Sequence, residues 1–185
     1  NYDYSSSYDS KDSADVNNVR MMIGSVHEEN TLQDRSIKFD HRYVGFKNHK
    51  IESGIDETFY DIMFYDHKMD GSISNESSIE QNGFLHSFYI QDLWTPSSLW
   101  VIQSGLRVSY FSERVGFYTS PRLSVINKIS PTITVESFIG KHYQFVHRLS
   151  GYNTTRGTQG MWILSSEDIP NISSLNTHFG LNWDF

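Results

Sequence analysis

The chain contains no cysteine and only four prolines among its 185 residues. Without cysteine, neither a disulfide framework nor a thiolate metal site can form. No run of residues approaches the roughly 18 consecutive apolar positions that a transmembrane helix needs, so that class is excluded as well. A formal net charge of −7 argues against a nucleic-acid partner, which selects a basic surface. Aromatic residues, by contrast, make up 15% of the chain, as expected where rings sit at membrane interfaces.

Residues 175–185 alternate between apolar and polar side chains, interrupted only by Thr177. Successive side chains of a β-strand point to opposite faces, so one side of this strand is apolar and the other is polar. Its length also fits the roughly 9–11 residues that cross the hydrocarbon core of a bilayer when tilted by about 45°. The pattern predicts a strand of a transmembrane β-barrel. The apolar face consists of Leu175, Phe179, Leu181, Trp183 and Phe185.

The same alternation recurs along most of the chain. Short turns at 47–50, 95–98 and 129–132 contrast with longer connections at 70–82 and 150–174, as in outer-membrane barrels, whose periplasmic turns are shorter than their extracellular loops. We therefore predict an all-β, antiparallel up-and-down transmembrane β-barrel, or a segment of a larger one, with about eight strands visible. All of residues 1–185 are assigned to it, with 1–30 partly extracellular loop, notably at 10–18. The clearest strands are predicted at 34–46, 49–68, 84–94, 99–111, 117–129, 132–149 and 175–185.

Charged side chains gather on one face of these strands. Four of them are candidates to line a lumen, although such residues also form ion pairs between strands or contact a plug. A small soluble barrel instead fills its interior with apolar side chains. The two cases are distinguishable, because Trp100, Leu106 and Phe179 face outward in a membrane barrel and pack inward in a soluble fold. The lumen-facing candidates are Arg107, Arg122, Lys128 and Glu136.

Two further groups of residues have predicted roles. Trp94, Trp100, Trp183 and Phe185 lie near the short-turn ends of their strands, where an aromatic girdle meets the membrane interface. The long connection at 150–174 offers side chains suited to stacking and hydrogen bonding with a ligand. An equally good interpretation is that Met161–Leu164 packs as an apolar core beneath that loop. The ligand-contact candidates are Tyr152, Asn153, Arg156, Gln159, Trp162 and Asp168.

No motif indicates catalysis. The histidines are scattered along the strands without the close spacing of a zinc site, and no nucleophile elbow or phosphate-binding loop is present. The acidic segment at 70–82 lacks the ligand spacing of a calcium loop. We therefore predict that the chain is not an enzyme and has no cofactor and no metal.

Five segments, taken together and in order, resemble a known family. Residues 88–96 (FYIQDLWTP) resemble a strand and periplasmic turn, 104–111 (SGLRVSYF) the following strand, and 120–124 (SPRLS) the next. Residues 140–149 (GKHYQFVHRL) and the hairpin at 39–54 are similar to further parts of the same barrel. The family is that of TonB-dependent outer-membrane receptors and transporters, in the form typical of Bacteroidota.

The resemblance implies import of a bulky nutrient across the bacterial outer membrane, with energy relayed by TonB. The nutrient would be a metal chelate, vitamin, peptide or oligosaccharide. The family's barrel has about 22 strands and an N-terminal plug domain. This chain shows no plug and no TonB box, so we expect it to be part of a barrel. Its implied partners are the lipid bilayer, a plug domain, the remaining strands, TonB indirectly and an unidentified substrate.

Two alternatives remain open at this point. One is a self-contained eight-stranded outer-membrane barrel with an adhesive or structural role, filled by side chains. The other is a soluble β-sandwich that serves as a binding module. The missing leader sequence at Asn1 fits either processing or an internal piece of a longer protein, and we expect the latter.

Overall fold

The computed structural model of the chain describes residues 2–16, 19–70, 73–153 and 157–184. This part of the chain is built of β-strands, and none of its residues belongs to a helix long and apolar enough to cross a membrane. The strands are β1 (Tyr2–Val16), β2 (Val19–Tyr43), β3 (His49–Asp70), β4 (Ile73–Ser97), β5 (Trp100–Phe111), β6 (Arg114–Ser130), β7 (Ile133–Gln144), β8 (Val146–Asn153), β9 (Gly157–Leu164) and β10 (Ile172–Trp183).

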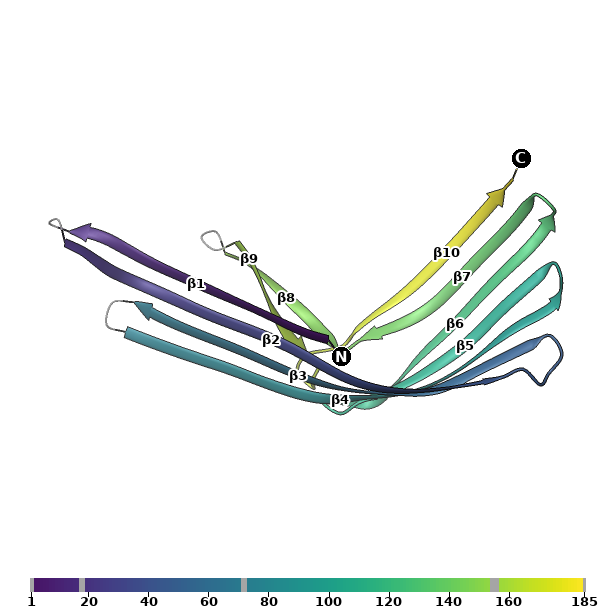
Figure 1. Ribbon diagram of the computed structural model, residues 1–185, viewed down its shortest axis with the longest axis horizontal. Coiled ribbons are helices and arrows are strands. Elements are labelled where there is room, and N and C mark those ends of the chain that lie inside the picture. Colours follow the sequence, from purple (N-terminus) through teal and green to yellow (C-terminus); the bar gives the residue numbers. More distant parts are fainter. Residues whose placement is uncertain (1, 17–18, 71–72, 154–156, 185) are drawn as a thin grey trace. The chain divides into compact units, whose positions relative to one another are not determined.

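Eight strands form one sheet in the order β1-β2-β3-β4-β5-β6-β7-β10, and β8 pairs with β9 in a separate two-stranded ribbon (Figure 1). The pairs β1–β2, β4–β5, β5–β6, β6–β7 and β7–β10 are antiparallel. Consecutive strands are therefore neighbours, apart from the inserted ribbon. This meander confirms the prediction of an all-β, antiparallel up-and-down sheet, with β1 and β10 as the edges of the sheet.

Short turns join the strands at one end. They lie at 44–48, 98–99 and 131–132, close to the turns that the sequence predicts. In the first turn Asn48 has a φ of 65°, a left-handed conformation that asparagine tolerates better than most residues. The amide of His49 donates to the carbonyl of Phe46 at 3.2 Å and starts β3.

The predicted loops are mostly strands. β3 ends at Asp70 and β4 begins at Ile73, although 70–82 was expected to be a loop. β1 continues to Val16 across a segment also expected to be a loop, and the connection at 150–174 contains most of the β8–β9 ribbon. These corrections have one cause. Cross-strand hydrogen bonds involve the backbone alone, so a strand whose two faces are both polar leaves no alternation to detect.

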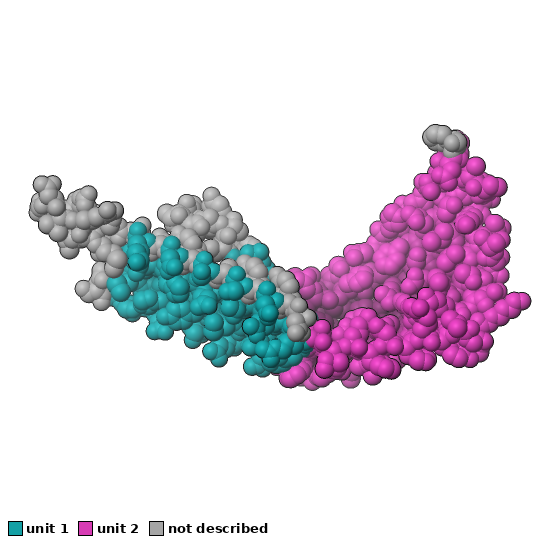
Figure 2. Space-filling model, viewed as in Figure 1, with its two compact units in different colours: residues 1–35, 59–83, 146–165 teal, residues 36–58, 84–145, 166–185 magenta. Residues whose placement is uncertain are grey.

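The chain divides into two compact units (Figure 2). Unit 1 comprises residues 1–35, 59–83 and 146–165, and unit 2 comprises residues 36–58, 84–145 and 166–185. β2, β3 and β4 each contribute residues to both units. The two units bury their side chains in different ways, and each is described by itself.

Unit 1 has two layers. The β8–β9 ribbon lies against the sheet: Asn30 Nδ2 donates to the carbonyl of Gly160 at 2.7 Å, and the amide of Leu164 donates to Gln81 Oε1 at 2.9 Å. A small apolar core lies between the sheet and the ribbon. Its buried side chains are Val26, Leu32, Ile62, Ile163 and Leu164.

Candidate functional site

One face of unit 2 is apolar and open to the surroundings. Trp100 and Leu106 are each 41% exposed and Phe179 is 74% exposed. These are the three side chains whose burial would have indicated a soluble core. Their exposure argues against a core on this side, and we call this side the outward face of unit 2. Phe88, Ile90, Leu123, Ile139, Leu175 and Leu181 are exposed as well.

Tryptophans lie on this face near the short turns. Trp94 pairs with Ile102 and stacks on the ring of His49, with centroids 5.7 Å apart and planes 7° from parallel. Trp100 is the first residue of β5, and Trp183 pairs with Ile133, the first residue of β7. All three thus belong to strand ends beside the turns. Phe185, the fourth residue of the predicted aromatic girdle, lies outside the described residues.

The opposite face of unit 2 is polar because the strand register brings polar residues into rows. One row crosses four strands, since Gln91 pairs with Gly105, Gly105 with Arg122 and Arg122 with Gly140. Arg122 Nη2 donates to Gln91 Oε1 at 2.5 Å, and therefore reaches across β5 from β6 to β4. Gln103 Nε2 donates to the same oxygen at 3.3 Å.

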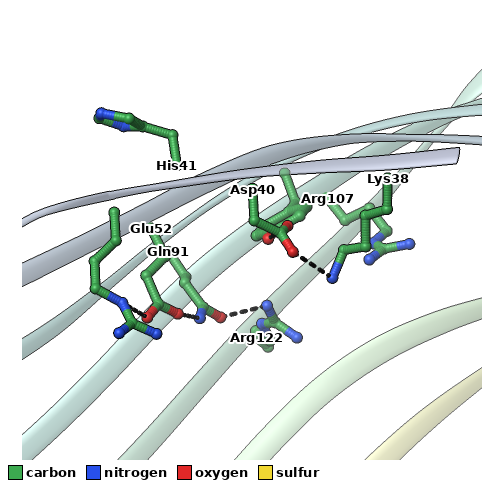
Figure 3. Close-up of a pocket in the computed structure, with 9 residues that line it drawn as sticks. Lys38, Asp40, His41, Glu52, Gln91, Arg107 and Arg122 are labelled. Carbon is green, nitrogen blue, oxygen red and sulfur yellow. Dashed lines mark hydrogen bonds and ion pairs between the residues drawn. The ribbon is translucent and has the colours of Figure 1, made fainter.

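Glu52 is the centre of a second set of contacts on this face. Its Oε1 accepts from Arg42 Nε at 2.8 Å and lies 3.1 Å from Lys50 Nζ. Its Oε2 accepts from Gln91 Nε2 at 2.6 Å. Because Gln91 also bonds to Arg122, a continuous chain of hydrogen bonds links β2, β3, β4 and β6 (Figure 3). Charge-assisted bonds of this kind are stronger than neutral ones, and they hold the strands in register.

Tyr89 organises the neighbouring part of this network. Its hydroxyl donates to Asp40 Oδ1, and Lys38 Nζ lies 3.2 Å from the other carboxylate oxygen. The guanidinium of Arg107 lies over the Tyr89 ring at 5.5 Å and 3.6 Å from Asp56. The side chains on this face are therefore mostly matched, with a carboxylate near each of the cations Lys38, Arg42 and Arg107.

Glycines make room for these contacts. A Cβ on Gly54 would lie 2.6 Å from both the Phe39 carbonyl oxygen and the Tyr89 ring. A Cβ on Gly105 would lie 2.8 Å from Arg122 Nε and 3.2 Å from the Cβ of Gln91. Real Cβ atoms do not approach other atoms so closely. Gly105 therefore leaves the gap through which Arg122 reaches Gln91.

A cavity of about 520 Å³ lies among these side chains. Arg107 and Arg122, both predicted to face a lumen, line it together with the Asp40, Glu52 and Gln91 contacts. His41 belongs to the opposite face, and Figure 3 shows its imidazole pointing away from the other labelled side chains. A polar, internally paired surface of this kind can form a stable wetted wall, but offers no activated nucleophile.

The other two lumen candidates lie outside the cavity. Lys128 is exposed on the same face of β6 as Arg122, nearer the short turn. Glu136 is half-exposed, and its Oε1 lies 3.1 Å from His178 Nε2. Two of the four residues predicted to face a lumen thus line the same cavity. For the described residues, no cluster of three or more His, Asp or Glu is placed to hold a metal ion.

The ligand-contact candidates do not form one described site. Tyr152, Asn153 and Gln159 lie on β8 and β9, but their side chains are outside the described residues, as is the whole of Arg156. Trp162 belongs to unit 1, with the guanidinium of Arg148 5.8 Å from its ring centre, and Asp168 is exposed in unit 2. Ile163 and Leu164 are buried, as the apolar-core interpretation of this segment expected.

Sequence reasoning missed the residues that organise the polar face. Lys38, Asp40, Glu52, Tyr89 and Gln91 were not among the predicted site residues, although each is on the polar side of its strand. The signal that could have found them was the alternation of polar and apolar residues, together with the family-like segments at 88–96, 104–111 and 120–124. Gln91, Arg107 and Arg122 belong to these three segments and all line the cavity.

No family model and no curated protein matches this sequence. Among solved structures, the crystal structure of the siderophore receptor PirA from Acinetobacter baumannii aligns with 99% of this chain, at 13% sequence identity and a TM-score of 0.45. The alignment covers 33% of that receptor, so this chain spans about a third of its length. A likeness at this identity and TM-score assigns neither fold nor function, and the proposals below rest on this chain's own residues.

Proposed function

We propose that the chain forms part of the wall of an outer-membrane β-barrel that belongs to a TonB-dependent receptor. The receptor would import a bulky nutrient, such as a metal chelate, vitamin, peptide or oligosaccharide, with energy relayed by TonB. In this role the chain is passive: one face contacts acyl chains, and the other forms the wall of a wet interior.

The observation that carries the proposal is the contrast between the two faces of unit 2. The outward face exposes large apolar side chains, whereas the other face carries a paired polar network. In water this arrangement is unfavourable, since burial of apolar area stabilises by about 25 cal/mol per Å² and here that burial is forgone. In a bilayer the arrangement is the expected one, because strands of membrane barrels alternate between lipid and lumen.

Charge on the outward face supports the same conclusion. An arginine or lysine on the lipid face costs about 2–4 kcal/mol at the midplane of the bilayer and little near the interfaces. The outward faces of β5 and β10 carry none. Lys141 does lie on the outward side of β7, opposite Leu175 and distant from the short turn, where its long side chain can reach the interface. Glu57 and His86 also lie on this face, form an ion pair with each other and are distant from the short turns along their strands.

The motif resemblance supports the choice of receptor among outer-membrane barrels. Three of the five family-like segments supply Gln91, Arg107 and Arg122 to one cavity, which gives a structural reason for the residue types at these positions. In addition, β1 and β10 are sheet edges in the described part of the chain, and a barrel must pair its edges. This favours a segment of a larger barrel over a closed eight-stranded one.

The proposal is tested by expressing the protein, in the longest form that its gene encodes, in a Gram-negative host. We expect it in the outer-membrane fraction, resistant to extraction by alkaline carbonate, and migrating faster on a gel before boiling than after. A sample that stays monodisperse without detergent would contradict the proposal. The flanking gene sequence separates the alternatives, since a plug-coding region upstream is expected only for a receptor.

A further inference from the structure

A second cavity, of about 280 Å³, lies on the polar face of unit 2. Its lining differs in charge from that of the first. Arg107, Arg122, Lys141 and His142 contribute to it, together with the hydroxyls of Ser87 and Ser109. Its lining residues, all within the described chain, include no aspartate or glutamate, in a protein whose formal net charge is −7.

The register explains why the two arginines converge. Arg107 pairs with Ser120 on β6, two residues from Arg122, so both guanidinium groups lie on one face of adjacent strands. Lys141 follows Gly140, the partner of Arg122, and pairs with Leu175 on β10, so strand alternation does not place it in the row of the two arginines. It contributes to the lining from the end of β7, where the recorded pairing with β6 stops, and the cavity thus has three cationic side chains from three strands.

Of these three cations in the described chain, only Arg107 has a carboxylate within ion-pair distance. Arg122 bonds to the neutral amide oxygen of Gln91, and the ammonium of Lys141 lies 4.8 Å from the centre of the Tyr143 ring. The carboxylate of Asp56 is 3.6 Å from Arg107, which is a long contact for an ion pair. Around Glu52, by contrast, Arg42 and Lys50 approach one carboxylate to 2.8 and 3.1 Å.

Aromatic rings and buried hydroxyls shape this cavity. Phe145 lies 5.1 Å from Phe111 and 5.0 Å from Tyr118, and Tyr118 lies 5.2 Å from Tyr143, measured between ring centres. Ser87 and Ser109 are buried and their hydroxyls are 2.9 Å apart. Rings packed in this way hold the cavity open and lower the local dielectric, which strengthens the attraction of the cations for an anion.

We propose that this cavity binds a compact polyanion, a small molecule that carries two or more carboxylate or phosphate groups. Two guanidinium groups offer the planar, paired donors that match carboxylate and phosphate oxygens, and Lys141 adds a point charge. The inference rests on the proposed function in one respect, because solutes reach the cavity from the interior of the barrel.

The test is calorimetric titration of the protein, in the longest form that its gene encodes, in an uncharged detergent. The probes are propane-1,2,3-tricarboxylate and pyrophosphate, which separate the two sources of anionic oxygen, and the neutral propane-1,2,3-tricarboxamide is the matched control. We expect binding of at least one anion, weakened by added sodium chloride, and no binding of the triamide. Binding of the triamide as tight as that of the tricarboxylate, or no binding of either anion up to about 10 mM, overturns the proposal.

Variants locate the binding. Arg107→Gln and Lys141→Gln should each lower the affinity about tenfold, the size expected for losing a hydrogen bond to a charged group. Lys128→Gln removes a cation from the same polar face outside the cavity and should leave the affinity unchanged. Equal losses in all three variants would show only a diffuse attraction, and would refute the site.

The migration shift on boiling is measured on every sample. A variant that shifts like the parent is folded, so its loss of binding reports on the cavity. A folded, detergent-dependent parent that binds neither anion refutes this inference and leaves the proposed function standing. A parent that is soluble without detergent refutes the proposed function, whatever it binds.

Discussion

Unit 1 and unit 2 share three strands but differ in whether their apolar side chains are buried. Among the side chains that the structure describes, the large exposed apolar ones belong to unit 2, with the exceptions of Ile73, Ile79 and Leu149. Unit 1 instead buries Ile62, Ile163 and Leu164 between its sheet and the β8–β9 ribbon. The apolar face of a strand can thus be covered by a second protein layer or left exposed.

The comparison teaches that one strand can change environment along its length. β4 alternates sharply from Phe84 to Ile90, with exposed apolar residues on one face and buried Ser87 and Tyr89 on the other. Between Ile73 and Glu80 the same strand is exposed on both faces. Substitutions of similar chemistry should therefore differ in their cost between the two units.

The largest expected effect is a cavity in unit 1. Leu164→Ala truncates a side chain that is 1% exposed, and should destabilise the ribbon–sheet packing by about 2–5 kcal/mol. Faster hydrogen exchange of β8 and β9 amides would report it. The same truncation at Leu106, which already lies 41% exposed, should cost much less in detergent, and equal costs would erase the contrast between the units.

A charge on the outward face of unit 2 should come next. Leu106→Arg is expected to cost about 2–4 kcal/mol if Leu106 lies near the middle of the bilayer. The measurement is the urea concentration that abolishes the migration shift in lipid vesicles. Ile79→Arg, at an exposed position in unit 1, is the matched control and should be close to neutral. If Leu106→Arg costs no more than Ile79→Arg, the argument that Leu106 contacts lipid fails.

Filling the gap at Gly105 should have a smaller effect. Gly105→Ala places a methyl group against Arg122 and should cost about 1–3 kcal/mol, the usual range for overpacking. In an Arg122→Ala background the same change should cost less, because the clashing side chain is gone. The double-mutant cycle in urea measures this coupling. Additive costs would mean that Gly105 does not serve the Arg122–Gln91 bond.

The smallest expected effect is that of pH on unit 1. His147 belongs to the β8–β9 ribbon, which is separate from the eight-stranded sheet proposed to face the membrane. It is buried, and burial lowers its pKa below the ordinary 6.5. Its Nε2 lies 2.8 Å from Ser165 Oγ. Since the folded pKa is the lower one, the stability is complete above about 6.5 and is lost as the pH falls towards the folded value.

Protection of the β8–β9 amides, corrected for the pH dependence of intrinsic exchange, should therefore decrease between pH 7 and pH 5. His147→Gln keeps a polar group of similar size without the titration, and should abolish most of this pH dependence. A ribbon whose protection is the same at both pH values, or a variant that responds like the parent, would show that His147 is not responsible.

The sequence could predict the strands whose two faces meet different surroundings. In β5, Trp100 and Leu106 alternate with Arg107 and Ser109, and the structure places the two sets on opposite faces. It could not predict the strand at Ile73–Glu80, where both faces are exposed and the pattern is lost. The β8–β9 ribbon was not predicted for a related reason, since the polar segment that joins β8 to β9 resembles a loop in composition.

The polar network lay beyond sequence reasoning because it depends on register. That Gln91 and Arg122 meet follows from their both pairing with Gly105, and a shift of one residue would place them on opposite faces. The residue types were visible, but which residues face each other across three strands was not.

β10 has consequences for how the protein is made. It lies at the edge of the sheet, and its apolar residues Leu175, Phe179 and Leu181 are all more than 60% exposed. An edge strand of this kind can pair with an extended peptide, including another copy of itself. In water such an edge favours aggregation, so the protein needs a chaperone or a partner that covers it.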